Sequence, residues 1–136
     1  MAEGIFRAGM EANEFEVSSA GVAAQPGSSA SLETLAVLEE KGISLDGFRS
    51  RMVSEAMLQE AEAVFCMTAG HLEMLEMMHP GFDGKFHLVC DFTEFDGQVG
   101  TDVPDPIGMG RAAYDSTFRV LSVASAGVIG FLRGRA

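Results

Sequence analysis

The sequence predicts an α/β domain in which a short parallel sheet is flanked by helices. Two apolar runs, at 63–68 and 85–92, have the length of strands. The first run is continuously apolar, which is typical of a strand buried on both faces of a parallel sheet. Stretches with apolar residues three and four apart separate these runs and predict helices. Strands that alternate with helices along the chain favour one parallel sheet with right-handed crossovers.

The chain opens with a predicted amphipathic helix at 1–10. Glu3 lies in its first turn, where a carboxylate favours the positive end of the helix dipole, and Ile5, Phe6 and Met10 form an apolar stripe. No Ser, Thr, Asp or Asn precedes this helix as a cap. We therefore expect the chain to be truncated ahead of it.

The middle of the chain predicts five elements from apolar spacing, caps and turn residues. They are a strand at 15–22, a loop at 23–30, a helix after Ser31 that ends at Gly42, a loop at 43–53, and a short helix after Ser54.

The last part of the chain adds two helices to the two apolar strands. A helix at 71–79 ends at Pro80 and Gly81, and a long helix runs from 110 to about 133. Between them lies an acidic loop at 93–106, which is rich in Gly and Pro. The predicted sheet is thus narrow, with three strands in a single domain at 1–136.

Composition excludes several classes of function. The net charge of −11 argues against nucleic-acid binding and against docking on anionic membranes. The most apolar late run, at 120–132, is too short to span a bilayer. Cys66 and Cys90 are not spaced as a metal pair and lie in apolar runs, so we expect free thiols, no metal, no cofactor and a cytoplasmic protein.

Five segments, in this order and spacing, resemble the low-molecular-weight protein-tyrosine phosphatases of bacterial type. They are MAEGIFR, SSAG, GFRSRMV, AVFCMTAGHLEML and DVPDPIG, and they extend over nearly the whole chain. The resemblance implies a three-layer Rossmann-like α/β fold and hydrolysis of phosphoric monoesters through a cysteinyl-phosphate intermediate.

One part of the family pattern has no counterpart in these 136 residues. The family's nucleophile lies in a C-x5-R-S-P loop, after a central strand and directly before the segment that here begins at Met1. The residue six positions after Cys66 is Leu72, and the residue six positions after Cys90 is Asp96, so neither cysteine has the required Arg. We expect the central strand and the loop to be missing, through a misassigned start, and the chain as given to be inactive.

The resemblance assigns roles to three residues that are present. Asp105 matches the general acid, which protonates the leaving oxygen. Ser19 matches a serine whose hydroxyl supports the phosphate loop, and Arg51 matches an arginine that braces that loop, often beside a His whose position Phe48 occupies here. The alternatives are a turn former or helix cap for Asp105, a strand-end turn for Ser19 and a solvated surface cation for Arg51.

Substrate and activity leave further alternatives. Ile107 and Gly108 follow the Asp-Pro pair where eukaryotic members carry aromatic residues, which leaves phosphotyrosine and phosphoarginine open as substrates. A non-catalytic pseudophosphatase that acts as a binding module is the second hypothesis. An arsenate reductase relative ranks lower, because those enzymes use extra cysteines in mobile loops, whereas Cys66 and Cys90 lie in predicted strands.

Overall fold

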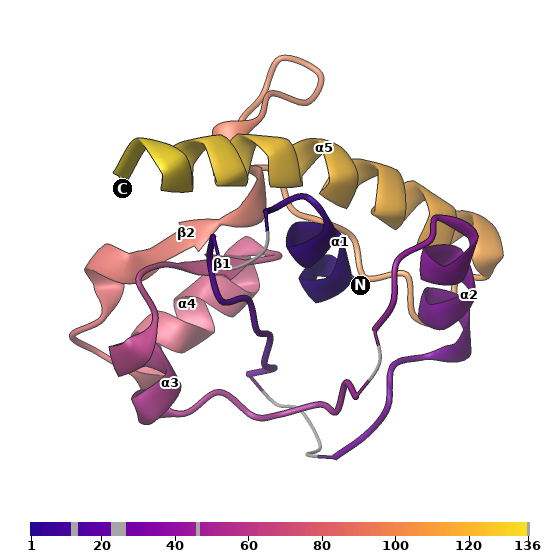
Figure 1. The fold of residues 1–136 in the computed structure, drawn as a ribbon. Helices are drawn as coiled ribbons and strands as arrows, with labels where there is room; N and C mark the ends of the chain where they lie inside the picture. Colours follow the sequence, from indigo (N-terminus) through magenta and orange to yellow (C-terminus); the bar gives the residue numbers. More distant parts are fainter. Residues whose placement is uncertain (12–13, 23–26, 46, 136) are drawn as a thin grey trace.

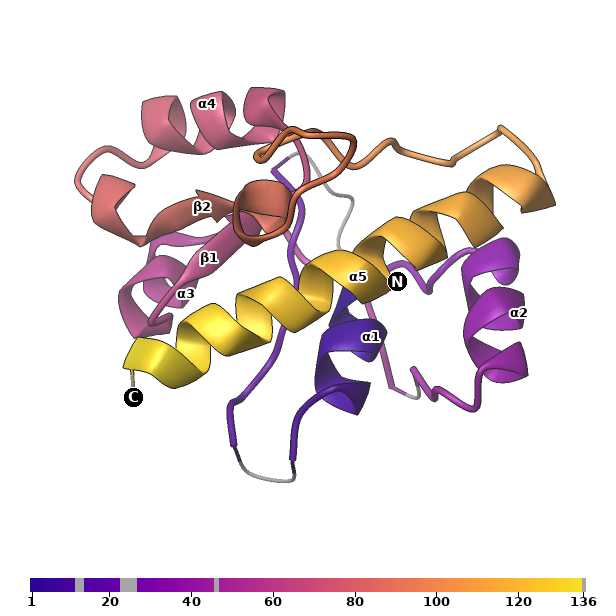
Figure 2. The ribbon, with the colours of Figure 1, turned by 90° about the horizontal axis from the view of Figure 1, so that it is seen from above.

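The structure is a computed structural model, and it describes residues 1–11, 14–22, 27–45 and 47–135. A two-stranded parallel sheet lies between a layer of helices α3 and α4 and the long helix α5 (Figures 1 and 2). Helix α1 lies beside α5, and α2 lies beside the N-terminal end of α5. The α-helices are α1 (Ala2–Ala8), α2 (Leu32–Glu40), α3 (Glu55–Glu60), α4 (Ala69–Met78) and α5 (Arg111–Arg135). The strands are β1 (Val64–Cys66) and β2 (Phe86–Leu88), and two 3-10 helices are η1 (Asp83–Lys85) and η2 (Val89–Phe92).

The two faces of the sheet bury different layers. Strands β1 and β2 pair in parallel with Phe65 opposite His87. On one face, Cys66 and Phe86 pack with Leu58 of α3 and Leu75 of α4. On the other face, Phe65 and His87 form a ring cluster with Phe92 of η2 and Phe131 of α5; centroids of neighbouring rings lie 4.2–6.3 Å apart. The predicted α/β architecture with a parallel sheet is therefore confirmed.

Helix caps determine where three of the helices begin. The side chains of Ser31, Ser54 and Thr68 accept hydrogen bonds from backbone amides in the first turns of α2, α3 and α4. A capping hydroxyl satisfies one of the free amides at the start of a helix. The predicted helices after Ser31 and Ser54 are thus confirmed, whereas the helix predicted at 71–79 begins two residues earlier.

The predicted strand at 15–22 is wrong. Within the described ranges, only Gly21 of this segment forms a β-bridge, a single parallel one with Met52. A strand requires a neighbour to receive its backbone hydrogen bonds. Among the described residues, no neighbouring strand pairs with the backbone of 15–20, and the Val17 carbonyl instead accepts a hydrogen bond of 2.8 Å from the Arg7 guanidinium. The sheet consequently has two strands in the described residues rather than three.

The second apolar run forms a shorter strand than predicted at 85–92. The carboxylate of Asp91 accepts a hydrogen bond of 2.8 Å from the backbone amide of Leu88. This local bond replaces a ladder bond and turns the chain into η2. Val89 and Cys90 of η2 are fully buried beneath α5.

Helix α5 organises the larger of the two cores. By length and composition alone, residues 111–134 of this helix are long enough and apolar enough to cross a membrane. The run at 120–132, considered by itself, is too short and does not predict this. A core helix of a globular domain meets the same criterion, and α5 buries one face against α1, α2 and η2. This core consists of Ile5, Phe6, Leu38, Leu45, Val89, Cys90, Val103, Leu121, Ala124, Val128 and Leu132.

A bidentate ion pair holds the C-terminal end of α5. Arg133 donates two hydrogen bonds, of 2.6 and 3.0 Å, to the carboxylate of Glu14. The hydrogen bonds from Arg133, and a further one from the backbone amide of Glu11, lower the pKa of Glu14 to about 2. The segment after α1 is thereby tied to the last turns of α5.

Helix α5 approaches the backbone at the end of η2 closely at Gly127. A Cβ atom at Gly127 would lie 2.4 Å from the carbonyl oxygen of Phe92 and 2.5 Å from Oγ1 of Thr93. Because a backbone carbonyl is among the opposing atoms, no side-chain rotation can relieve this overlap. By contrast, a Cβ atom at Gly130 would meet nothing within 4 Å.

We expect Gly127→Ala to lower the free energy of unfolding by about 3 kcal/mol, since α5 must move away from η2. The matched change Gly130→Ala, one turn along the same helix, should raise it by up to about 1 kcal/mol through helix propensity alone. Urea denaturation followed by circular dichroism measures both. Equal effects of the two changes would contradict the close packing at Gly127.

Candidate active site

Asp105 lies on the loop that leads into α5, and local bonds hold this loop. The backbone amide of Ile107 donates a hydrogen bond of 3.1 Å to Oδ1 of Asp105. A turn follows, in which the Met109 amide donates to the Pro106 carbonyl at 2.9 Å and Gly108 has φ of 73°. This positive φ at the third position of the turn favours glycine. Asp105 therefore acts as a turn former, as one alternative predicted, and its carboxylate remains exposed.

A hollow of about 310 Å³ opens beside Asp105, and we call it the main hollow. It lies where three parts of the chain meet: the start of α1, the start of α2 and the Asp105 loop with the first turns of α5. Apolar and hydroxyl-bearing side chains line it around a single carboxylate. Its lining residues are Met1, Ala30, Ser31, Thr34, Phe48, Asp105, Pro106, Ile107, Tyr114 and Thr117.

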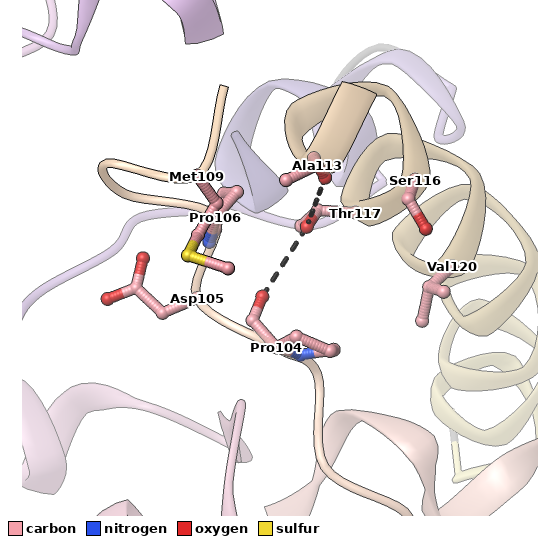
Figure 3. A pocket seen from close by; sticks show the side chains of 8 residues that line it. All are labelled: Pro104, Asp105, Pro106, Met109, Ala113, Ser116, Thr117 and Val120. Atoms are coloured by element: carbon pink, nitrogen blue, oxygen red, sulfur yellow. Dashed lines mark hydrogen bonds between the residues drawn. The ribbon is translucent and has the colours of Figure 1, made fainter. Parts of the chain in front are cut away.

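A smaller hollow of about 140 Å³ lies between the same loop and α5 (Figure 3). Asp105, Pro106 and Thr117 line both hollows. The Thr117 hydroxyl lies 3.0 Å from the Ala113 carbonyl and 3.4 Å from the Pro104 carbonyl, which connects α5 to the residue before Asp105. In Figure 3 the carboxylate of Asp105 points away from the smaller hollow.

Ser19 and Arg51 lie together at the first turn of α1. The Ser19 hydroxyl donates a hydrogen bond of 2.9 Å to Glu3, and the Arg51 guanidinium lies 3.4 Å from the Ser19 carbonyl oxygen, to which it donates. Glu3 also forms an ion pair of 3.3 Å with Arg7. The side chain of Glu3 is 9% exposed, so these contacts are partly shielded from water.

The structure thus connects the three predicted residues through α1 rather than directly. Ser19 contacts both Arg51 and Glu3, while Met1, two residues before Glu3, lines the main hollow with Asp105. Phe48 occupies the position where the family often has a His, and it lines the main hollow as a further apolar wall.

Neither cysteine has the environment of a nucleophile. Cys66 faces the α3 and α4 layer and Cys90 lies in η2, and both are buried free thiols. Burial, with a smaller contribution from the charge of Glu76, raises the pKa of Cys66 to about 11. Burial also raises the pKa of Cys90, against a hydrogen bond with Thr101 that lowers it. Because the thiolate is the attacking species, raised pKa values disfavour both as nucleophiles.

No group of three His, Cys, Asp or Glu side chains is placed to hold a metal ion within the described ranges. His71 and His79 lie near the two ends of α4, at its first turn and its C-cap.

Sequence reasoning missed three residues of this site. Glu3 was interpreted only as an acidic residue of a first helical turn, although it accepts the Ser19 hydrogen bond. Thr34 and Tyr114 were assigned only to helices, although both line the main hollow. Their spacing of 80 residues gives no local signal, since only the packing of α2 against α5 brings them together.

Comparison with known proteins agrees with this geometry. Residues 1–133 match the model of the family described as low molecular weight phosphotyrosine protein phosphatase. A protein-arginine-phosphatase of Geobacillus stearothermophilus is 37% identical over 101 residues, which cover 74% of this chain and 68% of that protein.

Solved structures show the same fold. The YwlE arginine phosphatase from Geobacillus stearothermophilus superimposes with a TM-score of 0.87 at 29% identity, over 98% of this chain and 84% of that one. A low molecular weight protein tyrosine phosphatase from T. tengcongensis gives a TM-score of 0.86 at 32% identity, over 95% of this chain and 87% of that one. The chain therefore belongs to the low molecular weight phosphotyrosine protein phosphatases, a family of phosphoric monoester hydrolases.

Proposed function

We propose that this chain supplies the general acid for hydrolysis of phosphorylated protein side chains and that Asp105 is this acid. The observation that carries the proposal is the position of Asp105, whose exposed carboxylate lies at the edge of the main hollow on a loop held by the Ile107 amide. Relatives named as protein-tyrosine and protein-arginine phosphatases support the substrate class.

The chemistry needs an acid in this place. When a thiolate attacks phosphorus, an S–P bond forms and the bond from phosphorus to the side chain breaks, which is P–O in phosphotyrosine and P–N in phosphoarginine. The leaving oxygen or nitrogen takes the bonding electron pair and receives a proton from the Asp105 carboxyl, and water then cleaves the S–P bond and releases phosphate. Cys66 and Cys90 are buried and have no Arg six positions later, so we propose that neither is the nucleophile and that these 136 residues alone do not hydrolyse phosphate esters.

We propose that Ser19 and Arg51 are supporting residues. The bond from Ser19 to Glu3 and the bond from Arg51 to the Ser19 carbonyl hold the segment before Gly21 against the first turn of α1. Met1 at the start of that helix lines the main hollow, so these contacts help to shape the wall opposite Asp105.

Both phosphotyrosine and phosphoarginine remain candidate substrates. Ile107 is 69% exposed beside the main hollow and offers an apolar wall without an aromatic face. At this position, where eukaryotic members carry aromatic residues, Ile107 itself gives phosphotyrosine no ring to stack on. The similarity to an arginine phosphatase at 37% identity supports phosphoarginine. The free thiols and the net charge of −11 support a cytoplasmic location and protein substrates rather than nucleic acids or membranes.

A non-catalytic binding module is the second candidate. The burial and raised pKa of both cysteines favour it, because the main hollow is formed without a reactive thiol among the described residues.

The role of Asp105 can be tested by extending the chain at its N-terminus with the family's strand and C-x5-R-S-P loop. We expect the extended chain to hydrolyse p-nitrophenyl phosphate, phosphotyrosine peptides or phosphoarginine peptides, and the 136-residue chain to hydrolyse none. In the extended chain, Asp105→Asn should lower kcat about 10²- to 10⁴-fold, because the leaving group loses its proton donor.

A matched control lies on the same loop. Asp96 is exposed at a tight turn with φ of 50°, a conformation that asparagine also adopts, so Asp96→Asn should leave kcat unchanged. Equal activity of the two variants would refute the role of Asp105. Turnover by the 136-residue chain that survives replacement of both cysteines would point to another mechanism.

The state of Cys66 predicts a dependence of stability on pH. The folded chain holds the thiol proton up to about pH 11, whereas the unfolded chain releases it near 9.0. The contribution of Cys66 to stability should therefore be complete below pH 9.0 and should decline as the pH rises toward 11.

Thermal unfolding across this range measures the effect. The midpoint of the wild-type chain should fall more steeply with pH than that of Cys66→Ala, which lacks the titrating group. Parallel curves for the two proteins would show that the thiol of Cys66 is not protected by burial.

A further inference from the structure

The segment that carries Asp105 has few groups that can bond to the rest of the fold. Asp105 lies between Pro104 and Pro106, and proline has no backbone N–H to donate. The carboxylate of Asp105 accepts a hydrogen bond from the Ile107 amide, which lies on the same loop. The Pro106 carbonyl accepts one from the Met109 amide, also on this loop. These bonds shape the loop, but they do not attach it to α5.

The attachment to α5 comes from Thr117, on the second turn of that helix. Its hydroxyl lies 3.4 Å from the Pro104 carbonyl oxygen and 3.0 Å from the Ala113 carbonyl oxygen (Figure 3). The two carbonyls share the single hydrogen of this hydroxyl. Among the described residues, no other hydrogen bond joins residues 104–109 to a residue outside that range.

Packing restrains the Asp105 segment only in part. Asp105 and Pro106 line both hollows, so part of their surface faces open space rather than packed side chains. Thr117 also lines both hollows, but its side chain is only 6% exposed. Burial shields its hydrogen bonds from competing water, and surroundings of low dielectric constant strengthen them. The link from Thr117 to Pro104 is thus a fixed point for a loop that lies beside two hollows.

We propose that Thr117 is a positioning residue for the general acid: its hydroxyl holds the Pro104 carbonyl and thereby fixes where the carboxylate of Asp105 lies at the main hollow. The proposal rests on the proposed function, because it requires Asp105 to be the proton donor. Proton transfer requires the donor to lie within hydrogen-bond distance of the leaving atom. A displacement of about 1 Å can lower the rate about 100-fold, so the point that holds the loop matters for the reaction.

A purely structural role for Thr117 is the alternative. Threonine within a helix commonly returns a hydrogen bond to the carbonyl four residues earlier, as Thr117 does to Ala113. Ser125 provides a matched control on the same helix. Its side chain is also 6% exposed, and its hydroxyl donates a hydrogen bond of 2.9 Å to the Ser122 carbonyl. Within the described ranges it forms no hydrogen bond with the Asp105 loop.

The kinetic test uses the N-terminally extended chain and two substrates with different leaving groups. Phenolate is a poor leaving group that needs a proton, whereas p-nitrophenolate needs it less. Thr117→Val keeps the shape of the side chain but removes the hydroxyl. It should lower kcat/KM for phenyl phosphate about tenfold, and kcat/KM for p-nitrophenyl phosphate by less. Thr117→Ser keeps the hydroxyl and should retain both values, and Ser125→Ala should leave both unchanged.

A double mutant separates an effect through Asp105 from a general effect on the structure. If Thr117 acts by placing that carboxylate, Thr117→Val should cause no further loss of kcat/KM in a chain that already carries Asp105→Asn. The same loss in both backgrounds would overturn the proposal. Equal losses for the two substrates, or a loss in Ser125→Ala as large as in Thr117→Val, would also overturn it.

The link itself can be measured by NMR on the 136-residue chain. Hydrogen exchange of the Ile107 and Met109 amides, which form the bonds within the loop, should be about tenfold faster in Thr117→Val, as expected for the loss of one hydrogen bond. Thr117→Ser and Ser125→Ala should exchange as the wild-type chain does. Unchanged exchange in Thr117→Val would show that the hydroxyl does not hold the loop.

The outcomes separate this role from the proposed function. If Asp105→Asn keeps the kcat of the extended chain, the proposed function fails, and the role of Thr117 fails with it. If Asp105→Asn lowers kcat while Thr117→Val changes neither kcat/KM nor amide exchange, only the role of Thr117 is overturned.

Discussion

The close packing of α5 on η2 is the constraint on which the rest of the structure depends. At Gly127 the two backbones approach so closely that a methyl group would overlap the Phe92 carbonyl. The loop that carries Asp105 begins directly after η2 and ends at the first turn of α5. The loop therefore begins and ends on the two elements that this contact joins, and local bonds at Asp105 and Pro106 hold its later part.

The same helix also assembles the main hollow. Tyr114 and Thr117 lie in the first turns of α5, and Thr34 comes from α2, which packs against α5. Arg111 of α5 forms an ion pair with Glu40 of α2 and another with Asp115 of its own helix. These pairs are exposed, so each contributes little to stability. The packing rests instead on apolar side chains of the larger core, among them Leu38 of α2 and Leu121 of α5.

Much of the fold could be predicted from the sequence, because caps and apolar spacing within each segment indicate the helices. Ser31 and Ser54 cap helices where the sequence predicts capping residues, and the apolar spacing at 110 to about 133 predicts the helix that the structure has as α5. Strands are harder to predict, because they depend on pairing with segments that are distant in the sequence. The segment at 15–22 has the composition of a strand, but a strand exists only where a neighbour pairs with it, and only Gly21 has one in the described residues. The carboxylate of Asp91, a single side chain, was enough to end β2 at Leu88.

The candidate site likewise has a part that the sequence predicts and a part that only the structure shows. Asp105, Ser19 and Arg51 were identified by resemblance to a family, since neither their spacing nor their surroundings in the sequence distinguish them from ordinary turn and surface residues. The structure adds what a motif cannot contain, namely that Glu3 joins Ser19 to α1 and that Tyr114 meets Asp105 across a hollow. The two cysteines show that a matching residue type is not enough to identify a site. Both are residues of the right type for the family's chemistry, yet both are buried, and burial raises their pKa values. Residue type therefore identifies a candidate site only together with position: the carboxylate of Asp105 is exposed on a loop beside a hollow, whereas both thiols are buried.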